Sequence, residues 1–202
     1  MKNALMIVGA GGHGRVTADM AALCGYRTIE FLDDAENQPI PLAGKVNDYE
    51  KFTDTHDFIV AVGDNAVRER LTNELIAGGA ELASLIHPSA VIGSGIHIGK
   101  GTVILANSVV NTGTFIGNGV ILNTACSVDH DCVIGDFAHV SVGAHLAGTV
   151  IIGKRTMIAA GATVINSLSV CDDCLIGAGT VVIRPISTPG TYVGVPARFL
   201  HG

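Results

Sequence analysis

The chain has 202 residues, of which only 15% are charged; glycine occurs 26 times and tryptophan is absent. The formal net charge is −6, which argues against a surface that binds the phosphates of nucleic acids. No apolar run reaches the roughly 18 residues of a membrane helix, and glycines interrupt the first apolar run before it could serve as a signal peptide. Five cysteines without a secretory signal indicate free thiols. We therefore expect a cytoplasmic protein that contacts neither nucleic acid nor membrane.

The distribution of charge divides the chain in two. Residues 1–82 contain 7 basic and 13 acidic residues, and residues 83–202 contain 5 of each, which together make the totals of 12 and 18. Such a change in composition is typical of a domain boundary. We predict an N-terminal domain over 1–82 and a second domain over 83–202.

The first part alternates strand and helix signals. Apolar runs at Ala4–Val8, Thr28–Leu32 and Phe58–Val62 each end at glycine or aspartate. Apolar residues at helical spacing follow the first run, and a second helical stretch covers about Ala66 to Ala77. The pattern predicts a small Rossmann-like α/β domain with a parallel sheet.

The motif Gly9–Gly14 reads GAGGHG, which matches the glycine fingerprint between a strand and a helix, and Asp33 follows it by nineteen residues. In this motif the glycines let a phosphate approach a helix N-terminus, and the acidic residue binds a ribose. About 82 residues hold only half a dinucleotide fold, so one nucleoside diphosphate fits better than NAD. An NAD-linked oxidoreductase and a tight turn without any ligand remain alternatives.

The second part is an internal repeat. Every sixth residue from Ile86 to Val182 is Ile, Leu or Val, a period that predicts stacked 18-residue coils of three short strands, about five coils in all. A small residue usually occurs four places later; Cys126, Cys132 and Cys174 occupy such positions, so we expect them to pack as small apolar groups. Glycines directly after the aliphatic residue suit tight corners or unusual backbone angles.

This repeat, the tail Gly194–Arg198 (GVPAR), the string at 123–148 and the N-terminal GAGGHG together resemble one family. It is that of the bacterial hexapeptide-repeat sugar acetyltransferases of the sialic-acid and bacillosamine pathways, nearest to the UDP-N-acetylbacillosamine N-acetyltransferases. The resemblance implies a left-handed parallel β-helix preceded by the Rossmann-like domain, assembled as a homotrimer. It also implies that acetyl-CoA acetylates the 4-amino group of a UDP-linked 4-amino-4,6-dideoxy sugar for bacterial glycan synthesis or protein glycosylation.

Candidate catalytic residues lie in a corner of the repeat. His130 stands between Asp129 and Asp131 in a region almost without charge, and a neighbouring carboxylate raises the basicity of an imidazole. The resemblance implies that His130 is the general base and Asp131 its adjacent carboxylate. From the sequence alone either aspartate can orient the ring, and a lone histidine is more often a surface residue.

The resemblance also assigns binding residues. It implies that His139 contacts the thioester region of acetyl-CoA, and that Ala160 and Ala178 follow the pantetheine. Lys154, Arg155 and Arg198 either meet the phosphates of CoA or are solvated. The residues implied for the UDP-sugar are Gly11, Gly12, His13, Asp33, Asp34 and Gly63.

A metal site is not expected. Ligands on stacked coils must lie above one another or face each other across an interface, whereas His97, His130, His139 and His145 follow at gaps of 33, 9 and 6 residues. Two other functions stay open from the sequence: O-acetylation of sialic acid or another sugar, and a non-catalytic β-helix trimer that only binds a nucleotide.

Overall fold

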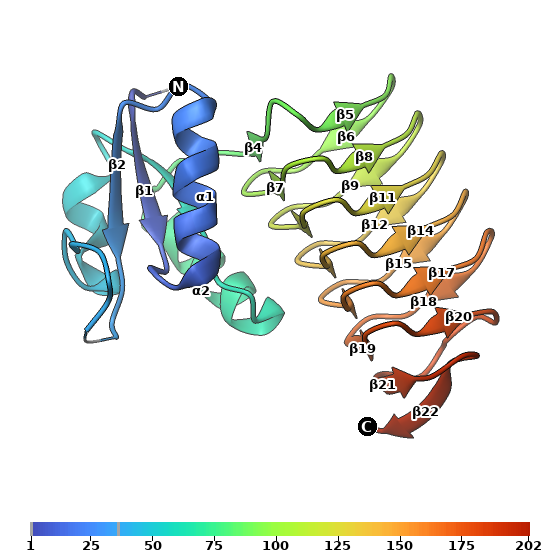
Figure 1. Ribbon diagram of the computed structural model, residues 1–202. Coiled ribbons are helices and arrows are strands. Elements are labelled where there is room, and N and C mark those ends of the chain that lie inside the picture. The colour runs from blue at the N-terminus through green and yellow to red at the C-terminus, as the bar shows by residue number, and fades with distance from the viewer. Residues whose placement is uncertain (1, 36) are drawn as a thin grey trace.

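The computed structural model describes residues 2–35 and 37–202, and it consists of an α/β region followed by a β-solenoid (Figure 1). In the α/β region three parallel strands are ordered β2-β1-β3. The Rossmann-like pattern predicted from the apolar runs is confirmed, with one short 3₁₀ helix that the sequence did not indicate. The elements are β1 (Ala4–Val8), α1 (Gly12–Leu23), β2 (Thr28–Leu32), η1 (Val46–Phe52), β3 (Asp57–Val60) and α2 (Asn65–Ala77).

The solenoid confirms the predicted mainly β, hexapeptide-repeat fold. Its strands are mostly two residues long, because each short strand ends at a turn after the inward aliphatic residue. The strands are β4 (Leu85–Ile86), β5 (Val91–Ile92), β6 (His97–Ile98), β7 (Val103–Ile104), β8 (Val109–Val110), β9 (Phe115–Ile116), β10 (Ile121–Leu122), β11 (Ser127–Val128), β12 (Val133–Ile134), β13 (His139–Val140), β14 (His145–Leu146), β15 (Ile151–Ile152), β16 (Met157–Ile158), β17 (Thr163–Val164), β18 (Ser169–Val170), β19 (Cys174–Ile176) and β20 (Val181–Val182). An antiparallel pair, β21 (Gly190–Val193) and β22 (Arg198–His201), ends the chain.

Three parallel sheets form the faces of the solenoid. The first face contains β4, β7, β10, β13, β16 and β19, and continues into β21 and β22; the second contains β5, β8, β11, β14, β17 and β20; the third contains β6, β9, β12, β15 and β18. There are six coils rather than about five, because a bridge from Val170 to Ile186 closes one more turn. The hexad residues fill the interior, where the aliphatic ladder is almost fully buried from Ile104 onward. Cys126, Cys132 and Cys174 lie buried in that interior as free thiols.

Glycines directly after the aliphatic residue serve close contact between coils. A Cβ added to Gly153 would lie 2.3 Å from the backbone nitrogen of Asp172 in the next coil. The expectation of unusual backbone angles at these glycines is wrong. Positive φ values occur two residues later in the turn, at Gly119 (+61°), Asp131 (+56°) and Phe137 (+57°) among others.

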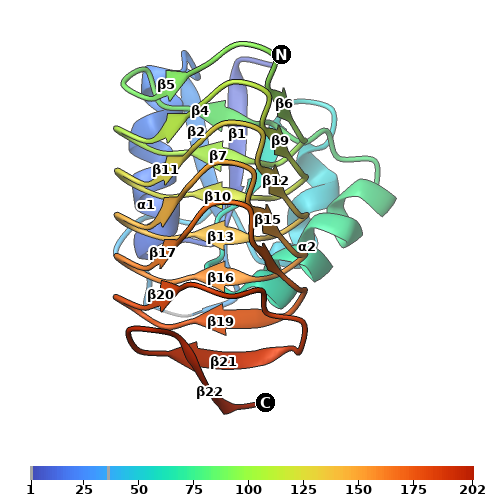
Figure 2. The same cartoon turned by 90° about the vertical axis from the view of Figure 1, so that its right-hand side faces the viewer.

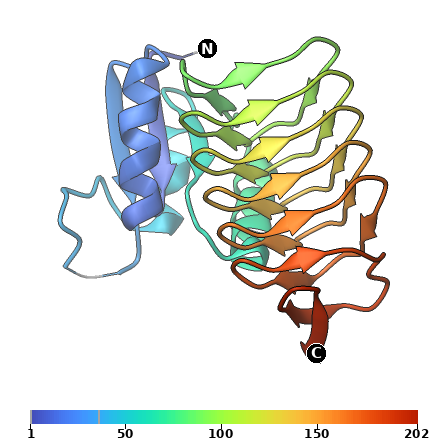
Figure 3. The ribbon, with the colours of Figure 1, turned by 45° about the vertical axis from the view of Figure 1, so that its right-hand side comes forward.

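The α/β region packs on the first face of the solenoid (Figures 1 and 3). One apolar cluster joins Leu5, Ile7 and Met20 to the outward side chains Val103 and Ile121 of that face. The turn between β11 and β12, where the second and third faces meet, lies on the opposite side of the solenoid (Figure 2). The boundary at 82/83 stays a prediction. In the described part of the chain, neither helix is long and apolar enough to cross a membrane.

Candidate active site

The corner between β11 and β12 presents a histidine–carboxylate pair. His130 Nδ1 lies 2.8 Å from Asp131 Oδ2, whereas Asp129 Oδ1 accepts hydrogen bonds from the His130 backbone N–H and from Asn111, both at 2.8 Å. The structure thus pairs the ring with Asp131, and Asp129 holds the turn. With Asp131 as acceptor, Nδ1 carries the proton and Nε2 keeps a free lone pair.

The surroundings of this ring make it a stronger base. The hydrogen bond to Asp131, with the charge of Asp129 second, raises the pKa of His130 above its usual value. The ring is half exposed, at 51% of its side-chain surface, and its Nε2 edge packs on Gly148, where an added Cβ would lie 2.5 Å from Nε2. A small residue at 148 is therefore needed to leave the ring in this position.

A second histidine lies in the opposite environment. His139, in β13 on the first face, is only 7% exposed because the α/β region covers it. Burial, with the charge of Arg68 as the second cause, lowers the pKa of His139 to about 3. The ring is therefore neutral at physiological pH and suits hydrogen bonding rather than charge.

Asn123 determines which nitrogen of His139 carries the proton. The Thr124 backbone N–H donates to Asn123 Oδ1 at 2.8 Å, so the other amide atom, Nδ2, points to His139 Nε2 at 3.1 Å. Since an amide nitrogen donates, Nε2 accepts and the proton resides on Nδ1. Nδ1 is buried without a hydrogen-bond partner among the described residues, and the backbone of Gly63, in the loop after β3, lies close to this ring.

The glycine motif lies close to His139, since His13 is among the groups that lower the pKa of His139. Gly11 and Gly12 stand at the start of α1, where no side chain caps the helix and nothing would contact an added Cβ. His13 Nε2 is also buried without a partner in the described chain, and burial, followed by the charge of Arg68, lowers the pKa of His13 to about 4. Free backbone N–H groups at a helix N-terminus favour a phosphate.

The residues that follow β2 and β3 lie close to the glycine motif, which follows β1. Asp33 Oδ2 accepts from the Ala10 backbone N–H at 2.7 Å, and Asp34 Oδ1 accepts from Val46 at 3.0 Å. Both carboxylates thus also shape the loops around the motif. Gly63, after β3, is exposed with open space around it. Residues from all three carboxyl strand ends are brought together, which is where ligands bind in parallel α/β folds.

Ala160 and Ala178 form a flat column at the corner between the first and second faces. They stand one above the other, since the Gly179 N–H donates to Ala160 O at 2.9 Å, and both are exposed. Nothing lies near Gly161 or Gly179 where a Cβ would be. An exposed strip of backbone without large side chains suits an extended chain with amide groups, such as pantetheine.

The predicted residues therefore occupy two edges of one molecule. His13, His139, Gly63 and the alanine column lie toward the first face, whereas His130 and Asp131 lie at the far edge of the second face. His139 follows His130 by nine residues, which is half of an 18-residue coil, so the two side chains face different sides of the solenoid. The roles of all these residues stay predictions.

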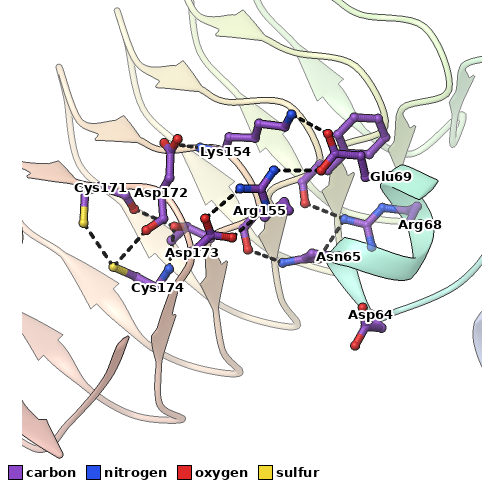
Figure 4. A network of polar contacts seen from close by, with 12 residues as sticks. Asp64, Asn65, Arg68, Glu69, Lys154, Arg155, Cys171, Asp172, Asp173 and Cys174 are labelled. Carbon is purple, nitrogen blue, oxygen red and sulfur yellow. Dashed lines mark hydrogen bonds and ion pairs between the residues drawn. The ribbon is translucent and has the colours of Figure 1, made fainter. Parts of the chain in front are cut away.

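The basic residues Lys154 and Arg155 were expected either to meet the phosphates of CoA or to be solvated, but the structure gives them acidic partners within the chain. Both form ion pairs with Glu69 of α2, and Arg155 also pairs with Asp173 at 2.6 Å (Figure 4). They connect α2 to the solenoid rather than standing free. No cluster of three or more histidine, cysteine or acidic side chains that suits a metal ion occurs within residues 2–35 and 37–202.

Three residues of the site were not found from the sequence. Asn123 and Gly148 border the two histidines, and Arg68 is buried between the two regions at 1% exposure. Arg68 stands in a helix among Glu69, Arg70 and Glu74, a pattern typical of a solvated face. The one available signal was indirect, because Asn123 and Gly148 begin and end the segment that carried the family resemblance.

Comparisons with known proteins agree with this geometry. The PglD N-terminal domain family matches residues 4–75. UDP-N-acetylbacillosamine N-acetyltransferase of Bacillus subtilis (strain 168) is 37% identical over 114 residues, 52% of this chain and 52% of that protein, so the match spans about half of the curated relative's length.

Solved structures extend the similarity to the whole chain. The acetyltransferase domain of PglB from Neisseria gonorrhoeae FA1090 is 39% identical with a TM-score of 0.94, over 98% of this chain and all of that one, and it has also been solved in complex with acetyl coenzyme A. PerB from Caulobacter crescentus, in complex with CoA and GDP-perosamine, is 32% identical with a TM-score of 0.91, over 98% of this chain and 97% of that one. This chain belongs to the hexapeptide-repeat sugar acetyltransferases with a PglD-type N-terminal domain.

Proposed function

We propose that the protein transfers the acetyl group of acetyl-CoA to the 4-amino group of a UDP-linked 4-amino-4,6-dideoxy sugar. The observation that carries the proposal is the His130–Asp131 pair, a base with a free Nε2. The relatives support it: one is named for UDP-N-acetylbacillosamine, one binds acetyl coenzyme A, and one binds CoA and GDP-perosamine. We assign the nucleotide part to Gly11, Gly12, His13, Asp33, Asp34 and Gly63, and the cofactor to His139, Ala160 and Ala178.

The chemistry needs one base and one donor. The sugar amine attacks the thioester carbonyl carbon, and His130 Nε2 takes the proton that the nitrogen loses. The new C–N bond gives a tetrahedral oxyanion, for which the Nδ1–H of His139 is the proposed donor. The C–S bond then breaks, and the thiolate of CoA leaves and takes the proton from His130.

We further propose that the site is completed by a second copy in a homotrimer. His130 and the alanine column lie at the two edges of the second face, so within one protomer they cannot meet. The outward column of that face contains no Asp, Glu, Lys or Arg: Val91, Val109, Ser127, His145, Thr163 and Val181. Threefold packing along this face sets His130 of one protomer against the column of the next.

Mixed trimers test the shared site. His130→Ala and His139→Ala proteins, each inactive alone, are unfolded together and refolded at equal concentration. A site shared between protomers restores about one quarter of wild-type activity, because each mixed trimer contains one intact pair. A monomer by light scattering, or no recovery in trimers shown to be mixed, would contradict the shared site.

Thiol release from acetyl-CoA tests the activity itself. A UDP-4-amino-4,6-dideoxy sugar is compared with the GDP- and dTDP-linked sugars and with sialic acid as acceptors. His130→Ala is expected to lower kcat by about 10²–10⁴-fold, whereas His87→Ala, in the first coil, serves as the matched control. Turnover with sialic acid alone favours the alternative O-acetyltransferase, and no turnover by a folded protein favours a nucleotide-binding β-helix without catalysis.

The proposed cellular site is the cytoplasm, where both co-substrates are made. The five free cysteines fit a reducing compartment.

A further inference from the structure

Arg68 is a charged side chain buried between the two regions. It is 1% exposed, and within the described residues no carboxylate forms an ion pair with it. Its N–H groups donate instead to neutral oxygens: Nε to Gly119 O at 2.8 Å, Nη1 to Val62 O at 2.9 Å and Gly63 O at 3.3 Å, and Nη2 to Asn65 Oδ1 and Phe137 O, both at 2.7 Å.

These acceptors belong to separate parts of the fold. Val62 and Gly63 form the loop after β3 of the α/β region, whereas Gly119 and Phe137 stand one coil apart in turns of the solenoid. Phe137 precedes His139 by two residues. Asn65 extends the contact, because its Nδ2 donates to Arg155 O at 2.7 Å in a lower turn (Figure 4). One planar group therefore ties a loop to two successive coils.

The same loop supports the glycine motif. A Cβ added at Gly9 would lie 2.9 Å from Ala61 O and 3.1 Å from Val62 Cγ2, so the turn that carries His13 rests on the segment that Arg68 holds. His13 Nε2 and His139 Nδ1 are the two buried side-chain nitrogen or oxygen atoms without a partner in the described chain. Arg68 thus holds the backbone next to both unpartnered atoms, namely the loop against which the glycine motif packs and the turn that precedes His139.

We propose that Arg68 is a positioning residue that acts through His13 and His139: it fixes the Gly63 loop to the second and third coils and so sets the gap between the two histidines. The inference rests on the proposed function for its kinetic consequence, since that gap would take the acyl and phosphate-bearing ends of the substrates. Arg68 itself touches neither substrate in this assignment.

The positive charge of Arg68 also affects the two histidines. Burial lowers the pKa of Arg68 to about 10, which leaves it charged at neutral pH. The titratable groups around this gap are the two histidines, His13 from α1 and His139 from β13, together with Arg68 from α2 and Asp64, the N-cap of α2. A guanidinium without a carboxylate partner helps to keep both imidazoles neutral and attracts a diphosphate.

Lysine cannot replace this arginine, because an ammonium on a flexible stem lacks the planar set of five donors. The test compares Arg68→Lys, Arg68→Met and Asn65→Ala with Arg70→Met. Arg70 lies two residues away on the same helix and, among the residues that the structure describes, pairs only with the exposed Glu74 at 2.9 Å. Each protein is first checked by thermal melting and light scattering, and only folded variants are scored.

Two readouts follow. Arg68→Lys is expected to lower kcat/KM by about 10²-fold through misplacement of the reacting groups, and Asn65→Ala less, while Arg70→Met matches wild type. Side-chain nitrogen NMR of labelled histidine follows protonation without substrate. His13 and His139 are expected to protonate at higher pH in Arg68→Met, and less so in Arg68→Lys.

Wild-type kinetics and unchanged histidine titrations in folded Arg68→Lys and Asn65→Ala proteins would overturn the proposal. If Arg68→Met does not fold, these two variants decide the result. If the wild-type protein acetylates no amino sugar, the proposed function fails, and the NMR titrations still report whether Arg68 governs the two histidines.

Discussion

His130 and His139 stand nine residues apart in one repeat, yet their environments are opposite. His130 is exposed beside Asp131, which raises its pKa, whereas His139 is covered by the α/β region and has its pKa lowered to about 3. Both histidines belong to the same repeat and border the same aliphatic interior. The difference between their pKa values therefore comes from the groups that lie outside the solenoid. One position meets carboxylates in a turn, and the other meets a second region of the protein.

The largest expected effect comes from moving the exposed base. In Gly148→Ala the added methyl carbon would lie only 2.5 Å from His130 Nε2, well inside van der Waals contact. The ring must swing away, and we expect kcat to fall by about 10²-fold because misplacement of a catalytic group by about 1 Å costs that much. Steady-state kinetics with both substrates measure it.

The distant nucleotide site provides the control for this variant. Gly148 lies at the corner opposite the α/β region, so binding of the nucleotide sugar and the melting temperature should match wild type. Equal loss of binding and of turnover would show that the substitution disturbs the coil rather than the base.

The exposed corner around His130 could be predicted from the sequence, whereas the covered surroundings of His139 could not. The fold follows from a period without interruption, and the His130 corner stood out because its two aspartates interrupt a region almost free of charge. The covered site gave no such signal. Arg68 is buried only because another part of the chain packs on α2, and neighbours such as Glu69 and Arg70 made that helix resemble a solvated face.

The glycines of the turns also have a role that the sequence pattern did not predict. Their position directly after the aliphatic residue predicted tight corners, but not that Gly153 must let the next coil approach while Asp131 takes the positive φ angle. Coil-to-coil distance is set by stacking, which a linear pattern does not contain. The catalytic and binding roles remain predictions on both sides of the comparison.

A smaller effect is expected from changing the covered histidine through its partner. Asn123→Ala removes the donor to His139 Nε2, so the imidazole is no longer held with its proton on Nδ1. Loss of one hydrogen bond of about 1 kcal/mol corresponds to a fall of about fivefold in kcat/KM.

Spectroscopy separates this outcome from a structural effect. Side-chain nitrogen NMR should show His139 change from a single tautomer to a mixture, while His130 keeps its titration. Wild-type tautomer and kinetics in Asn123→Ala would show that the amide has no part in the orientation of His139.

The smallest effect is a displacement of the pH profile. Asp131→Asn keeps a residue that tolerates the left-handed φ of +56° but removes the carboxylate whose hydrogen bond most raises the pKa of His130. The base acts when neutral, so the acidic limb of log kcat/KM, which lies above the usual histidine value in wild type, should move to lower pH. At alkaline pH, where both proteins hold a neutral ring, we expect a loss of only about twofold to threefold, because base strength enters the rate fractionally. Asp129→Asn, which removes only the second cause, should displace the limb less, and a larger displacement there than in Asp131→Asn would assign the orienting carboxylate to Asp129.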